Sequence, residues 1–240
     1  MNILIVGNGF DLSHYLPTKY DHFMVAMAAI ENWDESKGEM GFDDLFKELY
    51  EKEDYFFGYT KAIYKTEEVK ISVDEIKNLK NQLKENGWYQ YFLDHVKEVK
   101  TWIDFETKIE EALNCVTIFF DCIKEVYLKE NKLDLIIKTS GYRNNQHDNK
   151  FVYLNEKISN ALFSIRLFDK KFYRVENDRG ALKKVYSQNE LEKYDYFIKS
   201  EFLKDFKAYN AYNEVDCINF LNQQLEDFIK LFNFYIRSLS

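Results

Sequence analysis

The sequence predicts an α/β protein in which helix predominates. Three observations lead to this prediction. A short apolar segment and a glycine-rich turn open the chain, helix-like apolar spacing fills most of the remainder, and one alternating segment near residues 171–187 has the pattern of a β-hairpin. The chain has 240 residues, of which 46% are hydrophobic and 18% aromatic, and this is ample for a packed core.

The first predicted element is a buried strand over residues 2–6, which are mostly apolar and β-branched. Gly7, Asn8 and Gly9 follow and predict a tight turn before a helix. Such a strand, turn and helix are typical of a Rossmann-like nucleus, in which backbone N–H groups approach an anion because glycine lacks a Cβ. A purely structural turn that needs positive φ is the alternative interpretation. Leu12 stands where the dinucleotide fingerprint has its third glycine, so a standard dehydrogenase is disfavoured.

Two helices are predicted in the next part of the chain. Thr18 and Asp21 have the spacing of a capping box at the start of a helix that continues to residue 30. A second helix is predicted over residues 42–53, after a polar loop over 32–41. The aromatic run at residues 55–57 is expected to be core rather than a base-stacking surface.

Stronger local signals follow. Ser72 and Glu75 predict a capped helix that stops at Asn86 and Gly87, where the glycine would take the left-handed conformation. Apolar spacing predicts further amphipathic segments over residues 88–99, 102–127 and 214–236, the second of them as one long helix.

The β-hairpin is predicted from two alternating segments, residues 171–175 and 182–186, on either side of a glycine-ended loop. Residues 141–150 are rich in amide and turn residues and are expected to form a loop. The chain has no internal repeat and no linker-like segment. We therefore predict one domain, with a Rossmann-like N-terminal nucleus into which a large helical region is inserted.

Composition disfavours several classes of partner. The chain has 33 Lys and Arg against 41 Asp and Glu, a net charge of −8 without any basic run, so nucleic acid is not expected to bind. The apolar run before Gly7 lacks a basic flank and is too short to span a bilayer, so the sequence predicts a soluble cytoplasmic protein with no membrane partner. Three cysteines without a Cys-x-x-Cys pair fit a reducing compartment without structural zinc.

Two stretches of the chain resemble one known family. Residues 6–23, VGNGFDLSHYLPTKYDHF, closely resemble the start of the bacteriophage abortive infection protein family AbiH, and Trp102 to Glu106 is similar to that family's helical Trp-x-Asp-x-Glu element. The resemblance implies a bacterial phage-resistance protein with one AbiH-like domain over residues 1–240. It also implies a nucleus distantly similar to sirtuin-like NAD-binding proteins, with NAD or another nucleotide as ligand. The implied nucleotide-binding residues are Gly7, Asn8, Gly9, Phe10, Asp11 and Thr18.

The chain departs from the family pattern in two ways. Tyr15 stands where the family usually has glycine, and the family's Asn-Tyr-Thr and His-Gly elements do not occur in these 240 residues. We therefore expect a chain shortened at its C-terminus, with NAD hydrolysis implied for complete relatives. Such hydrolysis needs an acid–base group, for which the weak candidates here are His14 and Glu106. Their alternative role is hydrogen bonding to nearby backbone groups.

A second function class stays open, a non-catalytic helical interaction module. In this hypothesis the apolar face of residues 214–236 docks to a protein partner, a phage component or a second copy. Among the other histidines, His22 is expected to be exposed and His95 half-buried. No metal site is predicted, because no pair of histidines has ligand spacing.

Overall fold

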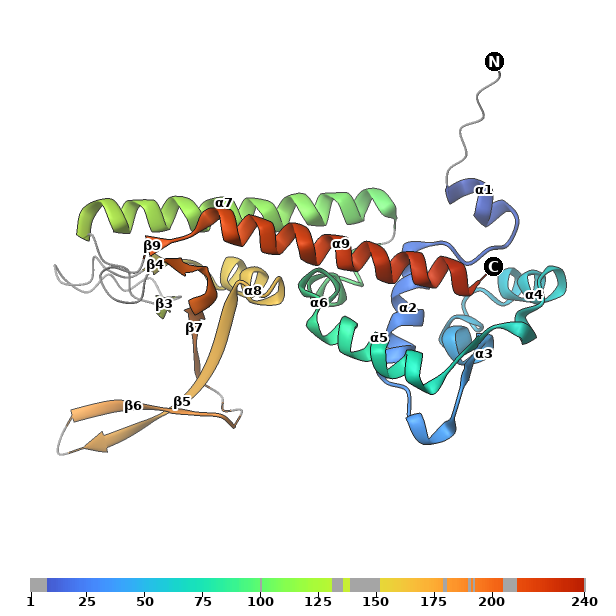
Figure 1. Cartoon of the computed structure of the whole chain (residues 1–240), viewed down its shortest axis with the longest axis horizontal. Helices are drawn as coiled ribbons and strands as arrows, with labels where there is room; N and C mark the ends of the chain where they lie inside the picture. Colours follow the sequence, from blue (N-terminus) through green and yellow to red (C-terminus); the bar gives the residue numbers. More distant parts are fainter. Residues whose placement is uncertain are drawn as a thin grey trace, which may run out of the picture. The chain divides into compact units, whose positions relative to one another are not determined.

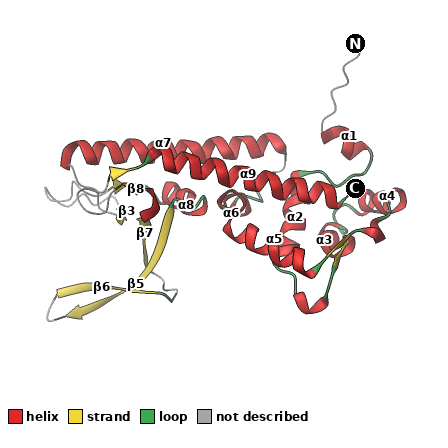
Figure 2. Ribbon diagram, viewed as in Figure 1, coloured by secondary structure: helices red, strands yellow, loops and turns green. Residues whose placement is uncertain are grey.

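The computed structural model describes residues 8–99, 101–130, 136–138, 152–178, 181–189, 191, 193–204 and 211–239. The chain forms two compact units (Figure 1). Unit 1 comprises Met1–Lys108 and Gln224–Ser240, and unit 2 comprises Ile109–Gln223. Over the described residues helix is the main secondary structure and the strands form small sheets, which confirms a helix-dominated α/β chain (Figure 2).

Unit 1 is built from short helices and one two-stranded sheet. Two long helices, α7 (Trp102–Glu130) and α9 (Glu214–Ser238), contribute to both units. The other elements of unit 1 are α1 (Asn8–Ser13), α2 (Tyr20–Glu31), η1 (Glu35–Lys37), β1 (Met40–Gly41), α3 (Phe42–Phe46), η2 (Lys47–Leu49), α4 (Asp54–Ile63), η3 (Thr66–Glu68), β2 (Lys70–Ile71), α5 (Val73–Glu85) and α6 (Gly87–Asp94). Strands β1 and β2 pair in antiparallel register.

An aromatic core holds unit 1 together. The ring of Phe23 on α2 lies edge-on to Phe228 and Tyr235 of α9, with 5.5 and 5.4 Å between ring centroids. Phe92 of α6 and Phe105 of α7 are 4.3 Å apart and complete the cluster. Burial of large aromatic side chains is a major source of folding free energy, so these contacts secure the last part of α9 within unit 1.

The strongest local predictions are confirmed. The Ser72 hydroxyl accepts a hydrogen bond from the backbone N–H of Glu75 (3.3 Å), and the Glu75 carboxylate accepts one from the backbone N–H of Ser72 (3.0 Å). These reciprocal bonds are the predicted capping box at the start of α5. The long helix from Trp102 and the helix from Glu214 also form as predicted.

Three predictions of helix ends are wrong. The capping box at Thr18 does not form, because α2 begins at Tyr20 and the Asp21 carboxylate accepts from the backbone N–H of His22 instead. The expected helix over 42–53 is split, since α3 ends at Phe46 and η2 follows it. Gly87 is the first residue of α6 rather than a left-handed cap, because the Asn86 side chain caps α6 directly after α5 ends.

Unit 2 has a five-stranded sheet in the order β4-β3-β7-β5-β6. Its strands are β3 (Ile136–Lys138), β4 (Val152–Tyr153), β5 (Phe168–Asp178), β6 (Ala181–Ser187) and β7 (Tyr194–Ile198), and α8 (Glu156–Ser164), η4 (Ser200–Phe202), β8 (Leu203–Lys204) and β9 (Ala211–Tyr212) complete it. Strands β5 and β6 are the predicted hairpin, in antiparallel register from Phe172 with Ser187 to Asp178 with Ala181. Phe119 of α7 packs on Phe168 at 4.9 Å.

The N-terminal nucleus is described only in part. The predicted strand over residues 2–6 and Gly7 lie outside the described residues, as does the predicted loop over 141–150. Asn8 and Gly9, which were expected to form a turn, belong to the first turn of α1. The Rossmann-like arrangement therefore stays a prediction.

Candidate functional site

A pocket of about 560 Å³ opens in unit 1 beside the segment that follows α1. Its wall comes from five places in the chain: Leu16 and Pro17, Phe42 of α3, the end of α4, the η3–β2 segment and the end of α9. The lining includes Lys65, Lys70 and Arg237 against one carboxylate, Glu68. We call it the cationic pocket. Its volume lies within the range of about 300–1,000 Å³ typical of small-molecule sites.

Side-chain hydroxyls that donate hydrogen bonds to backbone carbonyls hold the Leu16 and Pro17 side of the cationic pocket in place. Thr60 Oγ1 donates to the carbonyl of Tyr15 (2.7 Å), and the hydroxyl of Tyr64, the residue that follows α4, donates to the carbonyl of His14 (2.9 Å). From α9, the Tyr235 hydroxyl donates to the carbonyl of Pro17. The segment is thus fixed by side chains of two helices that are far apart in sequence.

The charges of the cationic pocket favour an anionic ligand. Lys65 Nζ donates to the Glu68 carboxylate (3.0 Å), which offsets one positive charge at the surface. Lys70 extends from β2 into the same lining, and Arg237 comes from the last turn of α9. A guanidinium and ammonium groups around one opening are suited to phosphate or carboxylate, because charge-assisted hydrogen bonds to these anions are strong.

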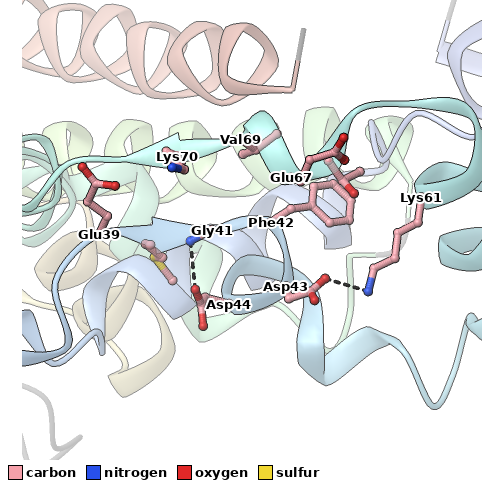
Figure 3. A pocket seen from close by; sticks show the side chains of 11 residues that line it. Glu39, Gly41, Phe42, Asp43, Asp44, Lys61, Glu67, Val69 and Lys70 are labelled. Atoms are coloured by element: carbon pink, nitrogen blue, oxygen red, sulfur yellow. Dashed lines mark hydrogen bonds and ion pairs between the residues drawn. The ribbon is translucent and has the colours of Figure 1, made fainter.

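A second pocket, of about 390 Å³, adjoins the first and has the opposite character (Figure 3). We call it the acidic pocket, and it shares Phe42, Thr66, Val69 and Lys70 with the cationic pocket. Its carboxylates are Glu39, Asp43, Asp44 and Glu67.

Two of these carboxylates have structural partners. Asp43 accepts from the Tyr50 hydroxyl and pairs with Lys61, both at 2.6 Å, and the Lys61 hydrogen bond is the main reason that the pKa of Asp43 is lowered. Asp44 accepts from the backbone N–H of Gly41 (2.8 Å) and so caps α3. The carboxylates of Asp43 and Asp44 therefore stabilise the fold through these bonds.

A polar cluster around His22 of α2 was not predicted. His22 was expected to be exposed, but it is fully buried, and its Nε2 lies 3.3 Å from Glu53 Oε1. Lys19 Nζ donates to the other oxygen of Glu53 (2.5 Å). The rings of Phe56 and Phe57 cover the imidazole at 5.2 and 5.4 Å. The error arose because the apolar spacing of α2 was assigned only one narrow face, whereas α4 covers a second one.

The electrostatics of this cluster are governed by burial. Desolvation lowers the pKa of His22, and the nearby carboxylates of Glu53 and Asp21 only partly oppose this effect. The Nδ1 atom of His22 is buried and has no hydrogen-bond partner among the described residues. A neutral imidazole that donates from Nε2 to Glu53 satisfies the most groups here.

The predicted nucleotide-binding residues are only partly described. Gly7 lies outside the described residues. Asn8, Gly9 and Phe10 are in α1, and the side chains of Asn8 and Phe10 are not described. Asp11 belongs to α1, and its carbonyl accepts from the backbone N–H groups of His14 and Leu16. Thr18 is buried. Neither Asp11 nor Thr18 lines either of the two described pockets.

The two residues considered as acid–base groups do not line the pockets either. His14 is exposed, with its Nδ1 3.2 Å from the hydroxyl of Ser13, and Glu106 is exposed on α7. The lysines and the arginine of the cationic pocket were not predicted. Single basic residues on an acidic chain have no motif, and only the fold brings them together.

Comparisons of the chain with protein-family models, with curated proteins and with solved structures found no match. The resemblance to AbiH therefore rests on the two sequence stretches alone. Within the part of the chain that the structure describes, no helix is both long enough and apolar enough to cross a membrane. Over the same residues, no three His, Cys, Asp or Glu side chains are grouped so that they could hold a metal ion.

Proposed function

We propose that the chain is a phage-defence protein of AbiH type that binds a nucleotide, such as NAD, with its phosphates in the cationic pocket. One observation carries this proposal. The pocket is bordered by Leu16 and Pro17, which belong to the family-like stretch over residues 6–23, and it is lined by three cationic side chains. Nucleotide phosphates are anions that arginine binds through two parallel N–H donors and lysine binds as a point charge.

In this proposal Arg237 orients the phosphates, while Lys70 and Lys65 neutralise their charge. The residues of the motif from Gly7 to Asp11 keep the ligand-facing role that the resemblance implies. Hydrolysis of NAD is proposed only for relatives that have the Asn-Tyr-Thr and His-Gly elements.

The interaction-module hypothesis concerns the apolar face of α9, which the rest of the chain covers in part. Its apolar side chains Leu221, Phe228, Leu231 and Tyr235 are buried within the chain. On the same helix Val215, Ile218 and Ile229 are exposed, so the face of residues 214–236 is only partly covered and docking through it stays a hypothesis.

The proposal is tested by calorimetric titration of the whole chain with NAD, ADP and inorganic pyrophosphate. We expect a Lys70→Gln, Arg237→Gln double variant to bind each phosphate ligand about 100-fold more weakly, since each charge-assisted bond contributes about tenfold or more. Lys77→Gln is the matched control, because Lys77 is exposed on α5 and outside both pockets.

Two results would overturn the proposal: no titrated ligand binds the wild-type chain, or the double variant binds as tightly as Lys77→Gln. Plaque counts on bacteria that express the wild type or the double variant test the defence role. Incubation with NAD, followed by measurement of released nicotinamide, separates binding from turnover.

A further inference from the structure

One face of α4 exposes large apolar side chains in a row. Tyr55, Tyr59 and Ile63 are spaced by four residues and are 69%, 41% and 55% exposed. Residues at this spacing lie on one side of a helix. Phe57, from the same aromatic run, points the other way and is buried, so the expectation that this run belongs to the core is met by Phe57 and not by Tyr55. We call Tyr55, Tyr59 and Ile63 the aromatic stripe.

The aromatic stripe leads directly into the cationic pocket. Ile63 lines the pocket, as do Thr60 from the same helix and Tyr64, the residue that follows the helix. The ring of Tyr59 stacks on Tyr15, with 4.7 Å between centroids and 16° between planes, and the residue after Tyr15 is the pocket residue Leu16. The ring of Tyr55 lies 4.6 Å from that of Tyr59. The aromatic stripe therefore adjoins the cationic pocket at two places, through Ile63 on α4 and through Tyr15 and Leu16.

The separation along α4 suits one class of ligand. At a rise of about 1.5 Å per residue, the pocket residue Ile63 lies about 6 Å along the helix from Tyr59 and about 12 Å from Tyr55. An occupant that places an anion among the cations and also covers the tyrosines must join a flat ring to a charged group over that span. Nucleoside diphosphates, nucleoside triphosphates and dinucleotides have this form.

We propose that the aromatic stripe binds the base of a nucleotide whose phosphates lie in the cationic pocket. This inference rests on the proposed function and adds the orientation of the ligand, with the base toward the first turn of α4 and the phosphates toward Lys70 and Arg237. Stacking on tyrosine does not distinguish one base from another, because every base offers a π-face. The site therefore favours nucleotides over phosphorylated compounds without a ring.

The test compares ADP with inorganic pyrophosphate, both titrated into the whole chain. Pyrophosphate reports on the pocket alone, and ADP reports on pocket and stripe together. Tyr55→Leu removes the most exposed ring, and Tyr55→Phe is the matched control that keeps it. We expect Tyr55→Leu to weaken ADP binding about tenfold and to leave the pyrophosphate affinity unchanged, with Tyr55→Phe close to wild type for both.

The possible failures are distinct. If Tyr55→Leu binds ADP as tightly as wild type, while Lys70→Gln with Arg237→Gln abolishes binding, the inference is overturned and the proposed function stands. An ADP affinity no greater than that of pyrophosphate in the wild type also overturns it. If neither ligand binds the wild type, both proposals fail.

Discussion

The ring of Tyr15 stacks on the ring of Tyr59, although the backbone of Tyr15 has a φ of 60°. This is the left-handed region, which glycine enters freely and most other residues enter only with strain. A glycine, the usual residue of the AbiH family at this place, would be unstrained there. In this chain the aromatic stack and the Thr60 hydrogen bond to the Tyr15 carbonyl offset the strain.

The strain at Tyr15 predicts an unusual order of stability. Tyr15→Ala loses the ring and keeps the strained backbone, whereas Tyr15→Gly loses the ring and relieves the strain. We expect both variants to be less stable than wild type, with Gly more stable than Ala by about 1 kcal/mol. Urea unfolding measures both. At an unstrained position Ala is the more stable, so that order would contradict the prediction.

Thr60→Val tests the link between α4 and the segment after α1. Valine keeps the shape of threonine but removes the hydroxyl that donates to the carbonyl of Tyr15. We expect a loss of about 1–2 kcal/mol in the free energy of unfolding, because the carbonyl loses its donor in a partly buried place. Thr117→Val is the control, since the Thr117 hydroxyl is exposed and bonds only within its own helix. Equal losses in both variants would argue against a specific link.

His22 predicts a loss of stability in mild acid. Burial lowers the pKa of His22 below its ordinary value of 6.5 in the folded chain, so below that pH the unfolded chain binds more protons than the folded one. The contribution of neutral His22 to the free energy of unfolding is therefore fully present above pH 6.5, and it is lost as the pH falls toward the pKa of His22 in the folded chain.

Unfolding free energies at pH 7.5, 6.5 and 5.5 measure the contribution of His22. We expect His22→Gln to flatten this dependence relative to wild type, and His14→Gln controls for the same change at an exposed histidine. If the unfolding free energy of His22→Gln changes with pH as steeply as that of wild type, His22 is not the cause of the loss of stability in mild acid.

Tyr235→Phe tests the anchor of the cationic pocket on α9. The variant keeps the buried ring and removes only the hydroxyl that donates to the carbonyl of Pro17. We expect a loss of about 1–2 kcal/mol, because the carbonyl is left without that donor in a buried place. Tyr55→Phe removes a hydroxyl from an exposed tyrosine, and its effect should stay within about 0.5 kcal/mol. A neutral Tyr235→Phe would show that this hydrogen bond contributes nothing to stability.

Much of the helical structure could be predicted because its causes are local. The Ser72 and Glu75 cap acts within three residues, and the apolar spacing of α7 repeats over many turns. The alternation of β5 and β6 flanks a short loop, so their pairing is also local. Strand β7 was missed, because only its place between β3 and β5 makes its five residues a strand.

The sequence by itself determined where the long helices and the hairpin form, since caps, turns and periodic spacing act between residues close in the chain. It also carries the likeness to AbiH. Only the tertiary structure decided that His22 is buried against Glu53, and that Pro17, Lys70 and Arg237 line one pocket. Apolar periodicity indicates that a helix face is covered by another element. Which element covers it depends on contacts between residues as far apart in the chain as Pro17 and Tyr235, and no local pattern encodes those contacts.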